Sequence, residues 1–409
     1  VVILKETNNV VLLQESENNL NDVLVIAYGN QKRNSFTGSI GTIKNTTIES
    51  APNSSVQETL QGNMAGVQST NATGQAGGVP QIRIRGIGSI NASATPLYVI
   101  DGIPVVSGDI SGLNSNTIAG LNANDIQSLT VLKDASATSL YGSRAANGVI
   151  LITTKRGKSD KVRVSYNGSV GISSPVELPQ NATAWDYMAM YDEANGNDLR
   201  TDAGIPGGAI FGPAKINEWK SSTDRDAFPN SDMIRETYKK QSTQTQHYIG
   251  FSHGNDHLKS NTSLTYQHQD AVIPNTFLKR YGLRSNNTYT INKYLDFGLD
   301  LSSRNTNITD ASPGTEIEGM MRQPAIFPTR FSNGVWGNNY AGTPHTMQFI
   351  FDKLSMRYEQ YQETIAKLYA RIRPIEGMTL DFTYTPRIAT SNFKGVSKTT
   401  NLYDYKTGD

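Results

Sequence analysis

From Lys161 onward, apolar and polar residues alternate in segments of roughly ten residues. In the first segment, one face of an extended chain would carry Val162, Val164, Tyr166, Val170 and Ile172. Further segments of this kind occupy 244–253, 258–268, 280–291, 294–304, 364–373 and 378–389. Because successive side chains of a strand point to opposite faces, the pattern predicts seven strands, each with one apolar face.

The links between these segments differ in length in a regular order. The links at 254–257, 292–293 and 374–377 are tight turns. The link at 269–279 is intermediate, and those at 174–243 and 305–363 are long. Outer-membrane β-barrels combine short periplasmic turns with long extracellular loops, whereas a soluble sandwich has no such rule. The pattern therefore predicts a transmembrane antiparallel barrel whose first strand runs outward. Seven strands would leave open edges in lipid, so we expect the first part of a larger barrel.

Composition excludes several classes of site. The chain of 409 residues contains no Cys, which excludes disulfides, thiolate metal sites and cysteine nucleophiles. A formal net charge of +1 gives no case for a nucleic-acid partner. Residues 1–15 lack the pattern of a signal peptide, so we expect the natural product to begin before Val1.

Three runs in the N-terminal part of the chain suggest a family. Residues 128–157 read SLTVLKDASATSLYGSRAANGVILITTKRG: an apolar strand, a small-residue helix, a Gly-rich turn and a second apolar strand. GQAGGVPQIRIRGIGSINASATPLYVIDGIP precedes it at 74–104, and NDVLVIAYGNQKR stands at 21–33. In this order the runs resemble the plug of TonB-dependent outer-membrane transporters, most closely the SusC/RagA branch.

The resemblance implies an α/β plug inside the lumen of a barrel of about 22 strands, of which this chain would supply about seven. It also implies four segments. Residues 1–16 would be the end of a carboxypeptidase-regulatory-like β domain, and 17–35 a linker. Residues 36–157 would be the plug, and 158–409 the first barrel strands with their extracellular loops.

The linker contains an apolar run that matches the position of the TonB box. An extended apolar segment on a tether can add as a strand to the sheet of a partner. The alternative is an ordinary strand of the N-terminal domain. The residues of the run are Asp22, Val23, Leu24, Val25, Ile26, Ala27 and Tyr28.

Arginines of the plug are candidates for pairing with the barrel wall. Arg83 and Arg85 alternate in QIRIRG and would share one strand face, and Arg144 lies in GSRAANG. Guanidinium groups bind carboxylates bidentately, so we expect wall carboxylates as partners, with a solvated strand face as the alternative. Asp101-Gly102 reads as a tight turn to which we assign no chemistry.

Aromatic residues gather in the two long links. Trp185, Tyr187 and Tyr191 have near-helical spacing in AWDYMAMYDEANG, and Trp336 lies in a turn-rich aromatic segment. Exposed rings could contact a ligand or partner, and buried rings could fill the cores of the loops.

The sequence predicts no enzyme. Gly86-Ile87-Gly88 lacks the third glycine of a dinucleotide fingerprint, and His247, His253, His257 and His268 fall on predicted strands and around a tight turn. We therefore expect no catalytic residue, no metal site and no cofactor.

The resemblance implies active import of a large nutrient, a glycan or an oligopeptide, across the outer membrane of a Bacteroidetes-like Gram-negative bacterium. Its expected partners are TonB, a SusD-like surface lipoprotein, the ligand and outer-membrane lipid, and one expected assembly is a dimer of transporter–lipoprotein pairs. Two alternatives remain open: a signal-transducing receptor, and a passive surface adhesin or antigen.

Overall fold

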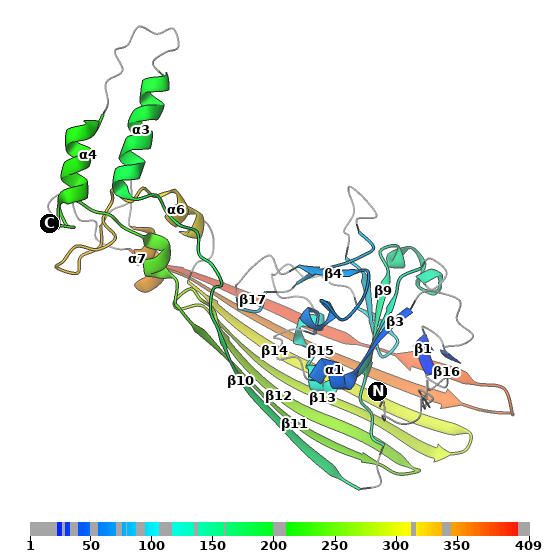
Figure 1. Cartoon of the computed structure of the whole chain (residues 1–409). Coiled ribbons are helices and arrows are strands. Elements are labelled where there is room, and N and C mark those ends of the chain that lie inside the picture. Colours follow the sequence, from blue (N-terminus) through cyan, green and yellow to red (C-terminus); the bar gives the residue numbers. More distant parts are fainter. Residues whose placement is uncertain are drawn as a thin grey trace, which may run out of the picture.

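The computed structural model of the chain describes residues 23–26, 29–32, 40–49, 56–70, 76–78, 80–86, 95–105, 117–134, 138–158, 161–198, 210–311, 316–337 and 345–399. These residues form a mixed α/β body, a long curved antiparallel sheet, and helices beyond one end of that sheet (Figure 1). None of the described helices is both long and apolar enough to cross a bilayer. The expected domain end at 1–16 lies outside the described residues, and the segment boundaries remain predictions.

We call the described residues between 40 and 158 the plug. It contains a five-stranded mixed sheet in the order β3-β8-β9-β6-β7, in which only the β6–β9 pair is parallel. The strands, in sheet order, are Ile40–Lys44, Ile126–Leu132, Val149–Thr154, Leu97–Ile100 and Ile103–Val105. A separate pair of strands and short helical turns complete the plug: β4 (Val67–Thr70), β5 (Gln81–Ile84), α1 (Asn45–Glu49), η2 (Glu58–Leu60), η3 (Thr117–Gly120), η4 (Ala123–Asp125) and η5 (Ser139–Ala145).

The plug has its own hydrophobic core on both faces of β9. Ile150 and Ile152 join one buried cluster, and Val149 and Leu151 join another on the opposite face. Full burial of each such side chain contributes roughly 1.5–3 kcal/mol. The plug is therefore stabilised by its own apolar contacts, as the two apolar runs of the sequence predict.

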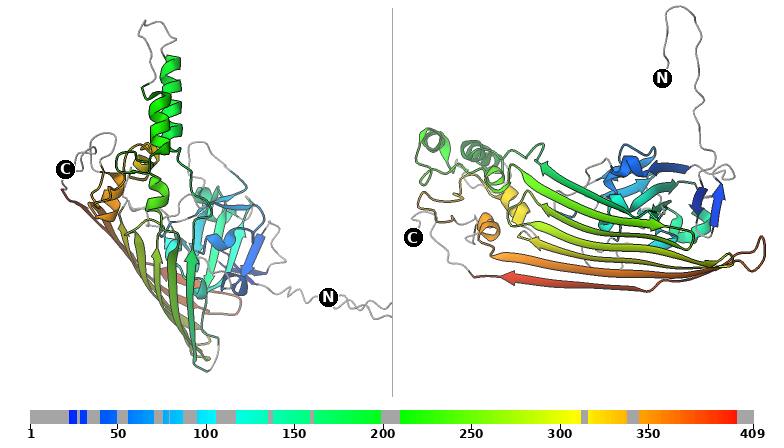
Figure 2. Two further views of the ribbon diagram at one scale, coloured as in Figure 1. Left: turned by 60° about the vertical axis from the view of Figure 1, so that its left-hand side comes forward. Right: turned by 90° about the horizontal axis from the view of Figure 1, so that it is seen from below.

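The second body is a curved sheet that we call the wall (Figure 2). All of its strand pairs are antiparallel, and from β10 to β15 each strand pairs with the next one in sequence. Its strands β10 to β17 are Arg163–Ser173, Ser242–Gly254, Leu258–Asp270, Phe277–Asn292, Leu295–Asp310, Ser355–Ile372, Leu380–Tyr384 and Arg387–Ser397. The sheet does not close on itself.

The seven predicted segments are all present in the wall sheet, which has eight strands because one of the segments is interrupted. The segment predicted at 378–389 is divided into β16 and β17, which pair with the two ends of β15. Pro386 lies between them and has no N–H to donate to the ladder, although its carbonyl oxygen accepts from the Ala366 N–H at 3.1 Å. One interrupted strand therefore takes the place of a continuous one.

The tight turns and the long links lie at opposite ends of the wall, as predicted. The links after β10 and β14 carry all of the described helices outside the plug (Figure 1). These helices are α3 (Ala184–Asp198), α4 (Gly212–Ser221), α5 (Met233–Thr237), α6 (Glu316–Arg322) and α7 (Thr346–Phe351). A separate two-stranded sheet, β1 (Val23–Ile26) and β2 (Gly29–Lys32), lies at the other end of the molecule.

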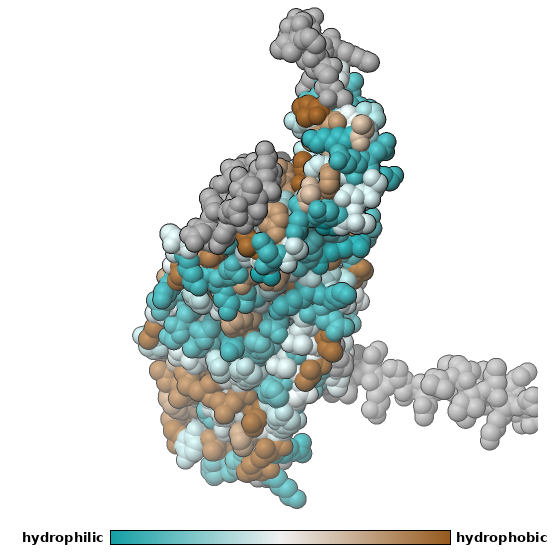
Figure 3. Space-filling view, turned by 90° about the vertical axis from the view of Figure 1, so that its left-hand side faces the viewer, coloured by the Kyte–Doolittle hydropathy of each residue, from teal (hydrophilic) through white to brown (hydrophobic). Residues whose placement is uncertain are grey.

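The wall face away from the plug carries an apolar band towards the tight turns, with polar surface nearer the helices (Figure 3). The exposed side chains of this band include Val164, Tyr166, Ile249, Phe251, Leu264, Tyr289, Phe297, Leu299 and Phe382. One row of paired residues crosses the sheet through Gly168, His247, Tyr266, Tyr281, Asn305, Gln362 and Thr390. The row carries rings from β11 to β13 and polar side chains on β14, β15 and β17. The band therefore runs obliquely to the strands, as expected when barrel strands tilt in a bilayer.

Leu264 lies in this band with half of its surface exposed, and Asn307 lies on the same face outside the band. We expect Leu264→Arg to lower the free energy of unfolding in lipid vesicles by about 2–4 kcal/mol, because it places a charge in hydrocarbon. Asn307→Arg should change it by less than about 1 kcal/mol. Urea titration of the vesicle-embedded protein measures both, and equal losses would contradict the position of the band.

Candidate functional site at the plug–wall seam

The turn between β6 and β7 carries Asp101 of the plug to the wall. Asp101 and Gly102 have φ of 48° and 83°, left-handed conformations that Asp and Gly tolerate well. The Asp101 carboxylate accepts from the Thr154 backbone N–H at 2.9 Å and hydroxyl at 2.6 Å, and lies 3.5 Å from Nη1 of Arg284. Lys367 donates to the Asp101 carbonyl oxygen at 2.6 Å. One turn thus joins β9 of the plug to wall strands β13 and β15.

Arg156 forms a second link, at the point where the chain leaves the plug. Its Nη1 and Nη2 donate to the two carboxylate oxygens of Asp300 in β14, at 2.9 and 2.6 Å. Nη1 also donates to the Tyr369 hydroxyl at 3.2 Å. Burial opposes the charge of Arg156, but the hydrogen bond and charge of Asp300 outweigh it and raise the pKa of Arg156 above its usual value. The pair is a bidentate, charge-assisted contact, the stronger kind of ion pair.

Asp125, at the end of η4, is a buried carboxyl group of the plug that faces the wall. It lies beside the hydroxyl groups of Tyr248 and Ser263, and the positive charges of Arg284 and Lys155 favour its ionised form. Burial raises the pKa of Asp125, and these neighbours only partly oppose the shift. A carboxyl group at the seam is therefore held in surroundings that disfavour its charge.

The backbone of the plug comes close to the wall beside these charges. The Asn286 side chain in β13 donates to the Thr154 hydroxyl at 2.8 Å and to the Lys155 carbonyl oxygen at 2.9 Å. A Cβ at Gly157 would lie 1.9 Å from the carbonyl oxygen of His253, so only glycine fits there. The exit of the chain from the plug is thus packed directly onto β11 and β12.

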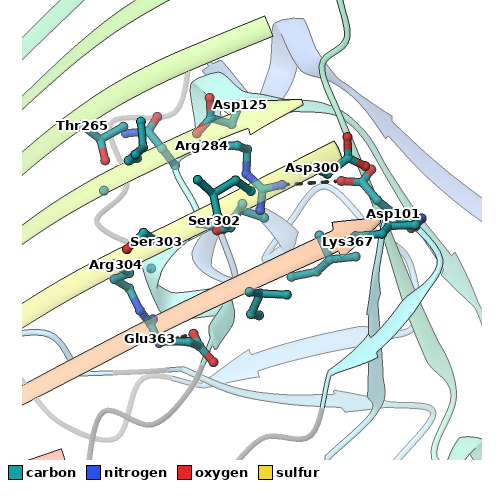
Figure 4. Close-up of a pocket in the computed structure, with 18 of the residues that line it drawn as sticks. Asp101, Asp125, Thr265, Arg284, Asp300, Ser302, Ser303, Arg304, Glu363 and Lys367 are labelled. Carbon is teal, nitrogen blue, oxygen red and sulfur yellow. Dashed lines mark hydrogen bonds and ion pairs between the residues drawn. The ribbon is translucent and has the colours of Figure 1, made fainter. Parts of the chain in front are cut away.

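A cavity of about 60 Å³ lies between the two bodies (Figure 4). A buried water needs about 10–15 Å³, so several waters fit. On its wall side, Arg304 donates to Glu363 at 2.9 Å, and a Cβ at Gly120 of the plug would lie 2.1 Å from Cδ of Arg304. Its charged lining residues are Asp101 and Asp125 from the plug, and Arg284, Asp300, Arg304, Glu363 and Lys367 from the wall.

The chemistry of the seam is that of a polar contact between two bodies. Within the part of the chain that the structure describes, no group of three His, Asp or Glu side chains could hold a metal ion. Hydrogen bonds and ion pairs beside a cavity large enough for water can exchange with water when the bodies separate. The seam is thus suited to reversible closure.

The predicted pairing of Arg85 with the wall stays a prediction, because the contacts of Arg85 among the described residues are with the plug. Arg85 forms an ion pair with Asp134 of the plug itself and donates to the Lys133 carbonyl oxygen at 3.3 Å. It follows the end of β5 with φ of 59°, so the alternation of the strand does not extend to it. Arg83 is half-buried in β5 and Arg144 is exposed in η5; their pairing with the wall stays a prediction.

The residues that reach the wall most directly, Asp101 and Arg156, were not predicted. The sequence signal at Asp101 was an Asp-Gly turn after a buried strand, and at Arg156 an Arg-Gly pair between the plug and the first alternating segment. Both signals also describe ordinary turns, so they do not by themselves distinguish a seam residue.

Part of the predicted TonB box is described. Val23 to Ile26 form β1, paired with β2, while Asp22, Ala27 and Tyr28 lie outside the described residues. The role of the segment as a coupling site stays a prediction.

The predicted helix with Trp185, Tyr187 and Tyr191 is present as α3. Trp185 and Tyr187 are half-buried and Tyr191 is exposed. The ring of Tyr191 lies 5.7 Å from that of Tyr187 and 5.9 Å from that of Phe211 at the start of α4. These rings remain candidates for contact with a ligand or partner.

Trp336 is buried, in agreement with the alternative that such a ring fills the core of a loop. Its contact with a ligand or partner stays a prediction. Its indole N–H donates to Asp352 at 2.8 Å, and the Arg330 guanidinium lies 4.0 Å from its ring. It joins a buried cluster that contains Met233, Met320 and several other apolar residues of the long links. Its aromatic surface stabilises the base of the loops.

Comparison with known proteins identifies relatives of both bodies. The TonB-dependent Receptor Plug Domain family matches residues 32–149. TonB-dependent receptor SusC of Bacteroides thetaiotaomicron is 33% identical over 340 residues, covering 80% of this chain and 31% of that protein. TonB-dependent receptor P3 of Formosa agariphila is 31% identical over 393 residues, covering 93% of this chain and 35% of that protein.

Solved structures of a RagAB peptide importer resemble the whole described fold. Its open-open state gives a TM-score of 0.74 at 27% identity, covering 93% of this chain and 44% of that one. Its closed-closed state gives 0.71 at 26% identity, with coverage of 90% and 42%. The chain spans about a third of the length of the curated relatives it matches.

Asp300 of β14 binds Arg156 of the plug, whereas Asp296, four residues earlier in the same strand, binds a residue of the wall. We therefore expect only Asp300 to stabilise the contact between plug and wall. Asp296 pairs with Arg373 of the wall at 2.5 Å, so the same substitution there leaves the plug contact intact. Asp300→Asn should weaken the seam by about 1–3 kcal/mol, because Arg156 loses its charged acceptor. We expect a raised passive leak of small solutes through the membrane-embedded protein. Asp296→Asn should leave leak at the wild-type level, and equal leak from the two variants would contradict the assignment.

The surroundings of Asp125 predict a pH-dependent stability. Because burial raises its pKa in the folded state, its charge disfavours folding once the pH rises through that value. Asp125→Asn should therefore raise the melting temperature at pH 8, with an advantage that disappears near pH 4, each unit of pKa shift being worth about 1.4 kcal/mol. Thermal unfolding at both pH values measures this. Asp256→Asn, in the exposed turn after β11, is the control. An advantage that persists at pH 4 would exclude charge as the cause.

Proposed function

Because the chain belongs to the SusC/RagA family of TonB-dependent transporters, proteins of the bacterial outer membrane, we propose that it is the plug and first wall strands of an active importer. The wall continues into a closed barrel, because an open sheet edge leaves backbone groups unpaired in lipid. The family resemblance implies about 22 strands for that barrel. The plug occludes the lumen of this barrel. The cargo is a nutrient too large for open pores, a glycan or an oligopeptide.

The polar seam carries this proposal. The plug has its own apolar core, and its contacts with the wall at Asp101, Asp125 and Arg156 are polar and border a cavity. A shared apolar core would resist separation, whereas polar contacts can be replaced by water at modest net cost. This arrangement supports a plug that moves or rearranges while the wall stays closed.

Energy enters from the periplasmic side through TonB, which binds the segment from Asp22 to Tyr28. Both Figure 1 and Figure 2 place β1 at the end of the molecule opposite the loop helices. That end also carries the tight turns, which are periplasmic in outer-membrane barrels. A pull on this segment acts on the plug from the side opposite the ligand.

The loop helices form the outer, ligand-capturing side. Tyr187, Tyr191 and Trp185 on α3 supply aromatic surface for a ligand or for a SusD-like lipoprotein that caps the transporter. The RagAB importer of similar structure takes peptides, and the name of SusC gives no cargo, so the choice between oligopeptide and glycan stays open.

Substitution of Val25 tests coupling separately from binding. Val25→Pro removes a backbone donor from β1, so uptake by cells should fall to the level of a TonB-null strain. Ligand binding to the purified protein should stay normal, because β1 lies outside the plug sheet. Val25→Ala keeps the backbone N–H and is the matched control, expected to transport at near the wild-type rate. Transport by Val25→Pro at the wild-type rate would exclude this segment as the coupling site.

A further inference from the structure

A groove lies directly beyond the first strand pair of the wall, on the side of the loop helices. The last opposed residues of β10 and β11 are Ser173 and Ser242, and the groove follows them. Residues 175–180, which follow β10, form one side of it, and residues 235–240, which precede β11, form the other. Its volume is about 450 Å³, which is in the usual range for a site that holds a small molecule. We call it the rim groove.

The rim groove is basic. Arg235, Lys239 and Lys240 line it, and among its described lining residues the only carboxylate is that of Glu177. The charge of Arg235 is partly offset by Asp232, whose carboxylate lies 3.3 Å away. Within the part of the chain that the structure describes, no carboxylate forms an ion pair with Lys239 or Lys240. Two ammonium groups of the groove are therefore available to an anion.

The apolar row of β10 fixes the height of the rim groove in the membrane. The exposed apolar side chains on the face away from the plug extend from Val162 to Ile172. At a rise of about 3.4 Å per residue and a strand tilt of about 40°, this row is about 25 Å tall, the height of the apolar band of an outer-membrane barrel. Residues 175–180 and 235–240 follow its upper end, on the side of the long links (Figure 1). They therefore lie at the level of the lipid headgroups of the outer leaflet.

The surroundings of the rim groove are amphipathic. Val176 is fully exposed and lines the groove together with Leu178, and the exposed Val170 and Ile172 lie below it on β10. An anion that carries apolar chains can contact both this row and the lysines, whereas a small soluble anion can contact only the lysines. A phosphorylated lipid thus matches the charge, the apolar row and the height of the groove.

We propose that the rim groove binds the phosphate group of an outer-leaflet glycolipid. Lys239 and Lys240 contact the phosphate, and the acyl chains lie along Val176 and the row of β10. Basic pockets beside a bilayer surface bind phosphorylated headgroups by the same charge complementarity. The inference goes beyond the proposed import: it depends on the location of the barrel in the outer membrane and not on transport.

The rival occupant is a soluble anion that carries the same charged group. Free phosphate would use the two lysines but would gain nothing from the apolar row below them. The two occupants therefore differ in their dependence on acyl chains, and the experiment compares a phosphorylated lipid with inorganic phosphate.

The test uses the full-length protein purified from outer membranes in a neutral detergent, with monophosphoryl lipid A as the probe and native mass spectrometry as the readout. Lys239→Gln/Lys240→Gln should weaken lipid binding by about tenfold, because both charges near the headgroup are lost. Lys239→Arg/Lys240→Arg keeps both charges and should bind like the wild type, which separates loss of charge from misfolding. Lys215→Gln/Lys220→Gln, at exposed positions of α4 beyond the end of the wall, is the matched control and should leave binding unchanged.

Two further probes identify the group that is bound. Lipid A from which the phosphate has been removed should bind the wild type as weakly as the phosphorylated lipid binds the Gln variant. Inorganic phosphate should not displace the phosphorylated lipid at equal concentration, because it lacks acyl chains. Equal binding of lipid A by the wild type and the Gln variant overturns the inference, and so does equal binding of the dephosphorylated lipid. Displacement by inorganic phosphate at equal concentration would assign the groove to a soluble anion and overturns the lipid assignment.

Discussion

The ion pair between Arg156 and Asp300 lies at the only covalent passage from plug to wall. Strand β9 ends at Thr154 and β10 begins at Arg163, so Arg156 lies in the short segment that joins the two bodies. Gly157 permits this segment to contact β11 and β12 directly. The plug is therefore fixed at its exit, and its remaining contacts with the wall follow from that position.

Apolar and polar contacts are divided between different parts of the molecule. The plug has two buried apolar clusters of its own, and the loop helices share a third that includes Trp336. A small cluster of Ala76, Ala271 and Leu278, with the partly buried Ile308, joins plug and wall. Charged and amide groups around Asp101 and Arg156 make further contacts between plug and wall. Each body can therefore keep its structure when the seam changes, because apolar burial lies mainly within bodies.

The same division explains why the predictions succeeded where they did. The alternation from Lys161 predicted the wall strands and the positions of the loops, because one face of each strand must be apolar. It failed at Pro386, where a missing N–H divides the last predicted strand. The separate alternation of QIRIRG ends at Ile84, because Arg85 has a left-handed backbone. Both interruptions arise from the backbone, which hydrophobic periodicity does not report.

The sequence by itself determined the family, the α/β plug, the apolar face of each strand and the order of short and long links. These depend on local periodicity and on motifs that are contiguous in the chain. Only the tertiary structure decided which charges meet at the seam. Arg85-Gly86 and Arg156-Gly157 look alike in the sequence, yet Arg85 binds Asp134 within the plug and Arg156 binds Asp300 in the wall. The partner of an arginine depends on which carboxylate the fold brings within a few ångströms, and Asp300 is separated from Arg156 by 144 positions in the chain.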